Sequence, residues 1–190
     1  MEWNVLKKSP MTIAFFSICA VIFLYGKVTT SENIRFLALS YEQFPQNWFT
    51  LLSHGFVHVE WYHFLINMFL LLYIGSWVEQ LLGKIKFLVL VVVCILSGGL
   101  TLVLLSTAGI GFSVAGMAIL FYYHLTFPWE KELFFNLPNF VLPLAIVVIS
   151  IVALTFGVMS SVGHIPHLVG AMIGIVFLIF FRKQHYPIKS

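Results

Sequence analysis

Ser113 stands between glycines in the stretch GFSVAG, residues 111–116, and this stretch lies between two long apolar segments. Most serines in such surroundings let neighbouring helices approach closely or bond to the backbone of their own helix. A serine can also act as a nucleophile, provided that a base lies near enough to take its proton. Which role applies depends on the other polar residues that can reach the hydroxyl.

Three other polar residues lie near the ends of apolar segments. His63 and Asn67 are four residues apart, so on a helix they share one face. His167 opens the last apolar segment. An ionisable side chain inside a membrane is a functional hypothesis by default, because burying it there is costly. Together with Ser113, these residues predict one wet cavity that is reached from three helices.

The last apolar segment also carries Gly170 and Gly174, which fall on roughly the same face as His167. Small residues spaced four apart let a neighbouring helix approach closely, and helix packing alone would explain them. If the neighbour is the helix that begins at Ser113, however, His167 comes within reach of the hydroxyl. Ser113 is then the nucleophile, and His167 is the base that takes its proton and later protonates the leaving amine.

A tetrahedral intermediate formed on Ser113 needs hydrogen-bond donors for its oxyanion. His63 and Asn67 can supply such donors, alongside the backbone N–H of Ser113. These two side chains are therefore predicted to form the oxyanion site.

Other hydrolytic chemistries fit the composition poorly. The chain has no aspartate, which excludes an aspartyl protease, and no HExxH sequence of the usual zinc proteases. His54, His58 and His63 are possible metal ligands, but no carboxylate or thiol completes the set, so we predict no metal site. None of the seven glutamates is placed to orient His167. The sequence therefore predicts a serine–histidine dyad without an acid.

The elements that position these residues are predicted to be membrane helices. Of the 190 residues, 61% are hydrophobic and 9% are charged, and the mean hydropathy is +1.01; a soluble domain carries about 25% charged residues. The net charge of +3 resides on basic residues at segment ends, which is typical of membrane topology and not of nucleic-acid binding. Cys19 and Cys94 lie in apolar runs and are expected to be unpaired.

We expect a single all-α polytopic domain, residues 1–190, that crosses the membrane six times. The first apolar run is read as a retained helix because no clear small-x-small cleavage site follows it. The one long connection, residues 27–62, is rich in aromatic residues and poor in charge, which favours a position in the headgroup layer. The predicted spans are residues 10–26, 63–82, 86–106, 113–127, 138–157 and 166–181.

The basic residues predict the orientation of these spans. With the N-terminus inside, only Lys27 and Arg35 fall on the outer side. This asymmetry matches the positive-inside rule and places both termini in the cytoplasm, as in a bacterial-type cell membrane. The residues on the cytoplasmic side are Lys7, Lys8, Lys84, Lys86, Lys131, Arg182, Lys183 and Lys189.

The fourth predicted span is too short to cross a bilayer core. Residues 113–127 form about 22 Å of helix at 1.5 Å per residue, against a core of about 30 Å. Pro128 and the charged residues after it hold its inner end at the surface, so Ser113 is expected to lie below the outer surface. Irregular backbone at that depth is tolerated only where it is packed in protein or lines a water-filled cavity.

Four motifs, in order along the chain, resemble those of the rhomboid intramembrane serine proteases. They are HVEWYHFLIN at 58–67, VEQLLG at 78–83, GFS at 111–113 and HLVGAMIG at 167–174. The resemblance covers essentially the whole length. It implies the six-helix rhomboid fold, cleavage of membrane-anchored single-span proteins near the outer face, and no cofactor. It also implies that Ser113 and His167 are catalytic, and that His63 and Asn67 bind the oxyanion.

Three positions depart from the pattern of that family. Val114 stands where the family usually has glycine, and Met117 stands where many members have an aromatic residue. The Trp-Arg pair of the family's first loop appears here only as Trp48-Phe49.

The alternative function is that of an inactive rhomboid-like protein, which binds membrane helices without cutting them, typically after loss of the serine or the histidine. This chain keeps both.

Overall fold

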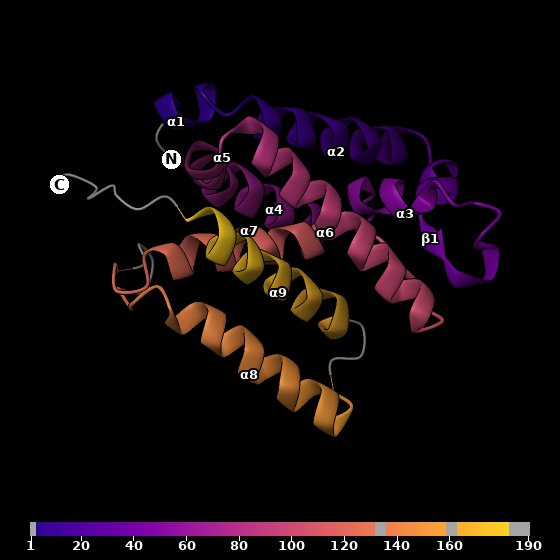
Figure 1. The fold of residues 1–190 in the computed structure, drawn as a ribbon. Helices are drawn as coiled ribbons and strands as arrows, with labels where there is room; N and C mark the ends of the chain where they lie inside the picture. Colours follow the sequence, from indigo (N-terminus) through magenta and orange to yellow (C-terminus); the bar gives the residue numbers. More distant parts are fainter. Residues whose placement is uncertain (1–2, 132–135, 159–162, 183–190) are drawn as a thin grey trace.

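The computed structural model describes residues 3–131, 136–158 and 163–182, which form a helical bundle (Figure 1). Lys183, Lys189 and two of the seven glutamates, Glu2 and Glu132, lie outside the described residues. The helices of the bundle are α1 (Trp3–Lys7), α2 (Pro10–Val28), α4 (Trp61–Leu70), α5 (Ser76–Leu82), α6 (Lys84–Leu104), α7 (Ser113–Thr126), α8 (Val141–Phe156) and α9 (His164–Phe181).

Each predicted span is found as a helix, although several ends differ. A π-helical turn, η4 (Leu71–Gly75), joins α4 and α5 into one long helix. By length and composition, four of the described helices can cross a membrane, namely α2, the α4–α5 helix, α6 and α9. The protein is therefore an integral membrane protein. The remaining two apolar helices are shorter, with 14 residues in α7 and 16 in α8, so a count of six crossings stays a prediction.

The fifth helix begins three residues later than the predicted start of the span near residue 138. Pro138 pairs with Lys131 in an isolated antiparallel bridge, and the Asn139 side chain donates to the carbonyl of Phe127 over 2.9 Å. These bonds draw residues 138–139 back toward the end of α7, so α8 begins only at Val141. The third span also begins earlier than predicted, because Gly83, at φ +81, reverses the chain within one residue.

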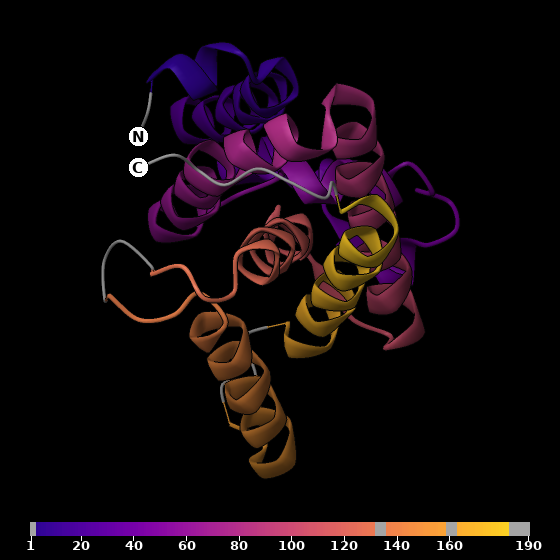
Figure 2. The same cartoon turned by 60° about the vertical axis from the view of Figure 1, so that its left-hand side comes forward.

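Helix α7 lies at the centre of the bundle, with α6, α8, α9 and the α4–α5 helix around it (Figure 2). It is apolar on all sides, and most of its residues are buried, which is typical of a helix enclosed by others. Its most extensive interface is with α9. Helix α8 packs much less closely, and its only buried residues are Pro143, Ser150 and Ala153.

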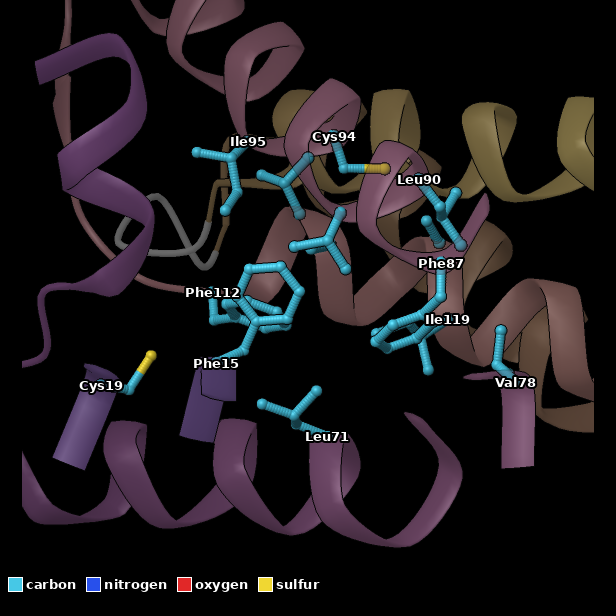
Figure 3. Close-up of a cluster of buried hydrophobic side chains, with 14 of the residues drawn as sticks. Phe15, Cys19, Leu71, Val78, Phe87, Leu90, Cys94, Ile95, Phe112 and Ile119 are labelled. Carbon is cyan, nitrogen blue, oxygen red and sulfur yellow. The ribbon is translucent and has the colours of Figure 1, made fainter. Parts of the chain in front are cut away.

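The main core lies between α2, the α4–α5 helix, α6 and α7. Figure 3 shows Phe15 of α2 against Phe112, with Leu71 from one side and Leu90 and Ile95 from another. The ring centroids of Phe15 and Phe112 are 5.9 Å apart. Phe112 is fully buried and immediately precedes Ser113, so core packing fixes the point at which α7 begins. Cys19 and Cys94 are free and buried, which confirms that they are unpaired.

A buried carboxylate fixes the beginning of α2. Glu79 of α5 is 1% exposed and accepts hydrogen bonds from the backbone N–H groups of Met11 (3.0 Å) and Thr12 (2.7 Å). The N–H groups of a first turn have no acceptor in their own helix, and a negative charge there is favourable. Pro10, whose missing N–H costs nothing in the first turn, completes this start. Glu79 thereby ties α2 to the rest of the bundle.

The long connection between α2 and α4 is folded and contacts the loop before Ser113. Its strand β1 (Leu39–Ser40) pairs antiparallel with β2 (Ala108–Gly109) in that loop. Trp48 is 69% exposed and Phe36 is 60% exposed, as suits aromatic residues at a membrane interface. The connection also contains the short helices η1 (Ser31–Leu37), η2 (Tyr41–Gln43), α3 (Thr50–Ser53) and η3 (His54–Phe56).

Candidate active site

Ser113 is the first residue of α7, and its hydroxyl meets a histidine from the first turn of α9. The Oγ atom of Ser113 lies 2.8 Å from Nε2 of His167, and both side chains are half-buried. A serine hydroxyl can donate to an unprotonated Nε2, which is the arrangement that a nucleophile and its base require. The structure thus brings together the two residues that the sequence analysis paired.

Two glycines of α9 allow the close approach that this hydrogen bond needs. A β-carbon on Gly170 would press against the carbonyl oxygen of Val114, and one on Gly174 would press against the carbonyl oxygen of Ala118. Any larger side chain would force α9 away from α7. His167 is three residues before Gly170, so it lies at the N-terminal end of this glycine contact on α9.

The loop before Ser113 turns at Gly111, whose φ of +108 is rarely adopted by other residues. The Gly111 N–H donates to the carbonyl of His54 over 2.8 Å. A β-carbon on Gly111 would lie 2.5 Å from Cε1 and Nε2 of the His63 ring. Both the backbone angle and the space therefore require glycine, and His63 lies directly against the loop that leads into the serine.

Asn67 lies one turn further along α4 and is buried in the same wall. Its Nδ2 donates to the carbonyl of His63 over 2.8 Å, which uses one of its two N–H groups. A β-carbon on Gly116 of α7 would lie 3.7 Å from Oδ1 of Asn67. Asn67 therefore turns its Oδ1 toward α7, and one of its two N–H groups is left over from the bond to His63.

These residues line a cavity of about 550 Å³, which we call the catalytic cavity. The volume lies within the usual range for sites that enclose a ligand. Over the described residues, no carboxylate oxygen lies within hydrogen-bonding distance of His167, and no three His, Cys or Glu side chains are grouped to hold a metal ion. The wall includes His63, Asn67, Ser113, Met117 and His167.

Sequence reasoning missed the part that His58 plays in this site. The His58 side chain is fully buried, and its Nε2 accepts a long hydrogen bond, 3.4 Å, from the N–H of Phe112. Its ring also meets the ring of His63 edge-on, with centroids 4.9 Å apart. Burial, assisted by the nearby His63, lowers the pKa of His58 to about 4, so the ring is neutral and can accept this bond at neutral pH.

His54 holds the same loop through its backbone. Its carbonyl accepts the bond from Gly111, while its Nδ1 lies 2.8 Å from the carbonyl of Thr50. Burial lowers the pKa of His54 as well. In the sequence, His54 and His58 were considered only as possible metal ligands together with His63, although His58 also opens the motif at 58–67.

A family model described as the rhomboid domain matches residues 45–184 of the chain. This chain belongs to the rhomboid family. The match includes Ser113, His167, His63 and Asn67, so every residue of the candidate site lies within the rhomboid domain. It also includes the helices from α4 to α9.

Curated relatives of this rhomboid protein are similar over most of its length. One is the rhomboid protease GlpG of Yersinia pestis (strain Pestoides F), which is 29% identical over 181 residues, covering 92% of this chain and 64% of the relative. The rhomboid protease GlpG of Yersinia pseudotuberculosis serotype O:3 matches to the same extent. That of Serratia proteamaculans is 24% identical over 186 residues, or 94% of this chain and 65% of the relative. The chain thus spans a little under two thirds of the length of these relatives.

The structure shows the surroundings of all three departures from the usual rhomboid pattern. Val114 packs against α6 at Gly98, where a β-carbon would lie 2.8 Å from Cγ2 of Val114. Met117, one turn after Ser113, is half-buried and lines the catalytic cavity. The side chains of Trp48 and Phe49, which lack the arginine of the usual pair, are both exposed.

Proposed function

We propose that this protein is an intramembrane serine endopeptidase that cleaves membrane-anchored, single-span proteins with a dyad of Ser113 and His167. The single observation that carries the proposal is the 2.8 Å contact between the Ser113 hydroxyl and Nε2 of His167. Membership of the rhomboid family and relatives named rhomboid proteases support it.

The chemistry follows from the positions of the two side chains. Nε2 of His167 takes the hydroxyl proton as Oγ of Ser113 bonds to the carbonyl carbon of the scissile peptide. When the tetrahedral intermediate collapses, the C–N bond breaks and the same Nε2 returns the proton to the leaving amine. A water molecule then attacks the acyl-enzyme, again with His167 as base, which releases the second product and restores Ser113.

The oxyanion of the intermediate is held by donors at the start of α7. The backbone N–H of Ser113 belongs to the first turn, whose N–H groups have no acceptor within the helix. We assign His63, which lies against the Gly111 loop, and the remaining N–H of Asn67 to the same oxyanion. A preorganised donor of this kind typically contributes about 10²–10³ in rate.

Cleavage of a single-span substrate by purified protein in liposomes tests the dyad. Residues that act as one unit give strongly non-additive losses, so Ser113→Ala, His167→Ala and the double variant should all fall to about the same low rate. Ser113→Ala should keep the unfolding temperature of the parent, because it loses one hydroxyl and no packing. Cleavage by Ser113→Ala at the parent rate would refute the dyad.

Covalent labelling by a fluorophosphonate separates the protease from the alternative function. The parent should be labelled at Ser113, and Ser113→Ala should not be. A parent that cleaves no substrate of a varied panel and takes no label would instead be a rhomboid-like protein that binds membrane helices without cutting them.

The orientation and the domain extent belong to the same proposal. We propose one rhomboid domain over residues 1–190, with both termini in the cytoplasm of a bacterial-type cell membrane and the catalytic cavity toward the outer face. Reporter fusions after Lys84 should report cytoplasm, and fusions within residues 27–62 should report the outside. A cytoplasmic signal from residues 27–62 would reverse the orientation.

A further inference from the structure

The catalytic cavity carries one formally charged residue in its wall, counted over the described part of the chain. That residue is Glu60, and the rest of the wall is apolar side chains, small residues and polar side chains that include three histidines. The Glu60 side chain is exposed. The one salt bridge found between described residues joins Arg35 to Glu32, so the Glu60 carboxylate has no ionic partner there. Its field acts on whatever enters the cavity.

Glu60 stands where the cavity meets the surface of the protein. It immediately precedes α4, and its carbonyl accepts the Phe64 N–H over 3.0 Å, which fixes its backbone on a long helix. It is three residues, or about one turn, before His63. Glu60 also lines a smaller adjoining pocket of about 270 Å³ whose other walls include Thr29, Thr30 and Ser31. The carboxylate therefore lies on the exposed side of the candidate oxyanion site.

The basic side chain that lines the smaller pocket lies over aromatic rings. Lys27 lines the pocket too, but its Nζ lies 5.4 Å from the ring centroid of Phe23 and 6.0 Å from that of Trp61. These are distances at which an ammonium group is attracted to an aromatic face. Lys27 weakens the negative field at the cavity entrance but forms no salt bridge with Glu60.

We infer that Glu60 determines specificity: it favours substrates with a lysine or arginine on the water-facing side of the scissile bond and disfavours those with an acidic residue there. The inference rests on the proposed protease function. A negative charge before α4 also suits the positive end of that helix. That role changes stability, however, and it does not distinguish between two substrates.

The expected preference is modest because the carboxylate is exposed. Two unit charges about 8 Å apart in water change an association constant by about twofold to threefold. The lysine substrate is attracted by this factor and the glutamate substrate is repelled by the same factor, so the two effects multiply. The parent should therefore cleave the lysine substrate about fivefold faster than the glutamate substrate. The ratio should approach one at about 1 M salt, where the screening length falls to about 3 Å.

The test is a charge swap between enzyme and substrate. A single-span substrate carries lysine, glutamine or glutamate in turn at each of four positions on the water-facing side of the scissile bond. The value of kcat/KM is measured in neutral liposomes at low and high salt and is divided by that for the glutamine substrate. Glu60→Gln should bring the lysine-to-glutamate ratio close to one, and Glu60→Lys should invert it.

A matched control separates local charge from net charge. Glu42 is exposed in the connection between α2 and α4 and does not line the catalytic cavity. Glu42→Lys therefore makes the same charge change elsewhere and should keep the parent's preference for lysine over glutamate substrates. A ratio near one at all four positions in an active parent overturns the inference and leaves the protease proposal intact. A ratio that Glu60→Lys does not change overturns it as well. A parent that neither cleaves any substrate nor takes a fluorophosphonate label overturns both.

Discussion

Adding a single methyl group at Gly170 should separate the two residues of the candidate dyad. A β-carbon there would lie 3.0 Å from the carbonyl carbon of Val114 and closer still to its oxygen. Non-bonded carbon atoms prefer about 3.5–4.0 Å, and the obstacle is helix backbone, which has no rotamer to change. Helices α7 and α9 must therefore move apart by on the order of 1 Å in Gly170→Ala.

This displacement is large compared with the tolerance of the catalytic contact. The Ser113–His167 distance of 2.8 Å would lengthen to roughly 3.8 Å, beyond the usual hydrogen-bond limit of about 3.2 Å. Misplacement of a catalytic group by about 1 Å can lower the rate about 10²-fold. Overpacking of a close interface costs about 1–3 kcal/mol of stability. We expect both losses in Gly170→Ala.

Two other glycine-to-alanine variants serve as controls for Gly170→Ala. Gly174→Ala meets the backbone of Ala118 one turn further from the dyad, so it should lose similar stability but less activity. At Gly163, at the start of α9, the nearest atom to a β-carbon is Cγ of Pro166 at 3.7 Å, an ordinary contact. Gly163→Ala should therefore behave like the parent.

The assay is kcat/KM on a single-span substrate in liposomes, with thermal unfolding and the rate of fluorophosphonate labelling measured on the same preparations. Gly170→Ala should be slow in both reactions. If it cleaves, labels and unfolds as the parent does, the glycine contact does not hold the dyad together, and the reasoning is refuted.

Three further substitutions test other parts of the structure. Glu79→Gln should lower the free energy of unfolding by about 1–3 kcal/mol, because a charged acceptor of two backbone N–H groups is lost. Thermal unfolding measures this loss, and Glu130→Gln, at an exposed position, is the control that should leave stability unchanged. Burial lowers the pKa of His58 from 6.5 to about 4, so its contribution to stability is complete above pH 6.5 and is lost as the pH falls toward 4. The unfolding temperature of His58→Gln should therefore fall less than that of the parent between pH 6.5 and 4. Asn67→Ala should lower kcat about 10²-fold while the protein stays folded, whereas parent-like cleavage would leave the oxyanion to other donors.

The helices and the pairing of Ser113 with His167 were predictable because they depend on local patterns. Apolar runs of membrane length mark helices whatever they pack against. The short run after Ser113 predicts a helix that is too short to cross the bilayer core. The glycines after His167 predict a close contact between their helix and a neighbour. Ends of helices were less predictable, as α8 shows, because its start depends on bonds from Pro138 and Asn139 to residues at the end of α7.

The supporting roles of His58 and Glu79 were not predictable for a physical reason. Each side chain bonds to backbone N–H groups that are 54 to 68 residues away in sequence. A backbone N–H has the same chemistry in every residue, so no residue type marks the partner. Only the packed arrangement of helices shows that His58 accepts a hydrogen bond from the Phe112 N–H, or that Glu79 of α5 accepts bonds from the first turn of α2.

Val114 shows how a departure from a family pattern is accommodated in three dimensions. Where the family usually has glycine, this chain has a side chain that occupies the space left by Gly98 of α6; a β-carbon at Gly98 would lie 2.8 Å from its Cγ2. The other γ-carbon, Cγ1, would lie 3.2 Å from a β-carbon at Gly170, so α9 leaves room for the same side chain. The backbone N–H of Ser113 and the contact with His167 are untouched by this packing. The small residue that the crossing of α6 and α7 requires is supplied by the facing helix, so valine after the nucleophile is compatible with an intact dyad.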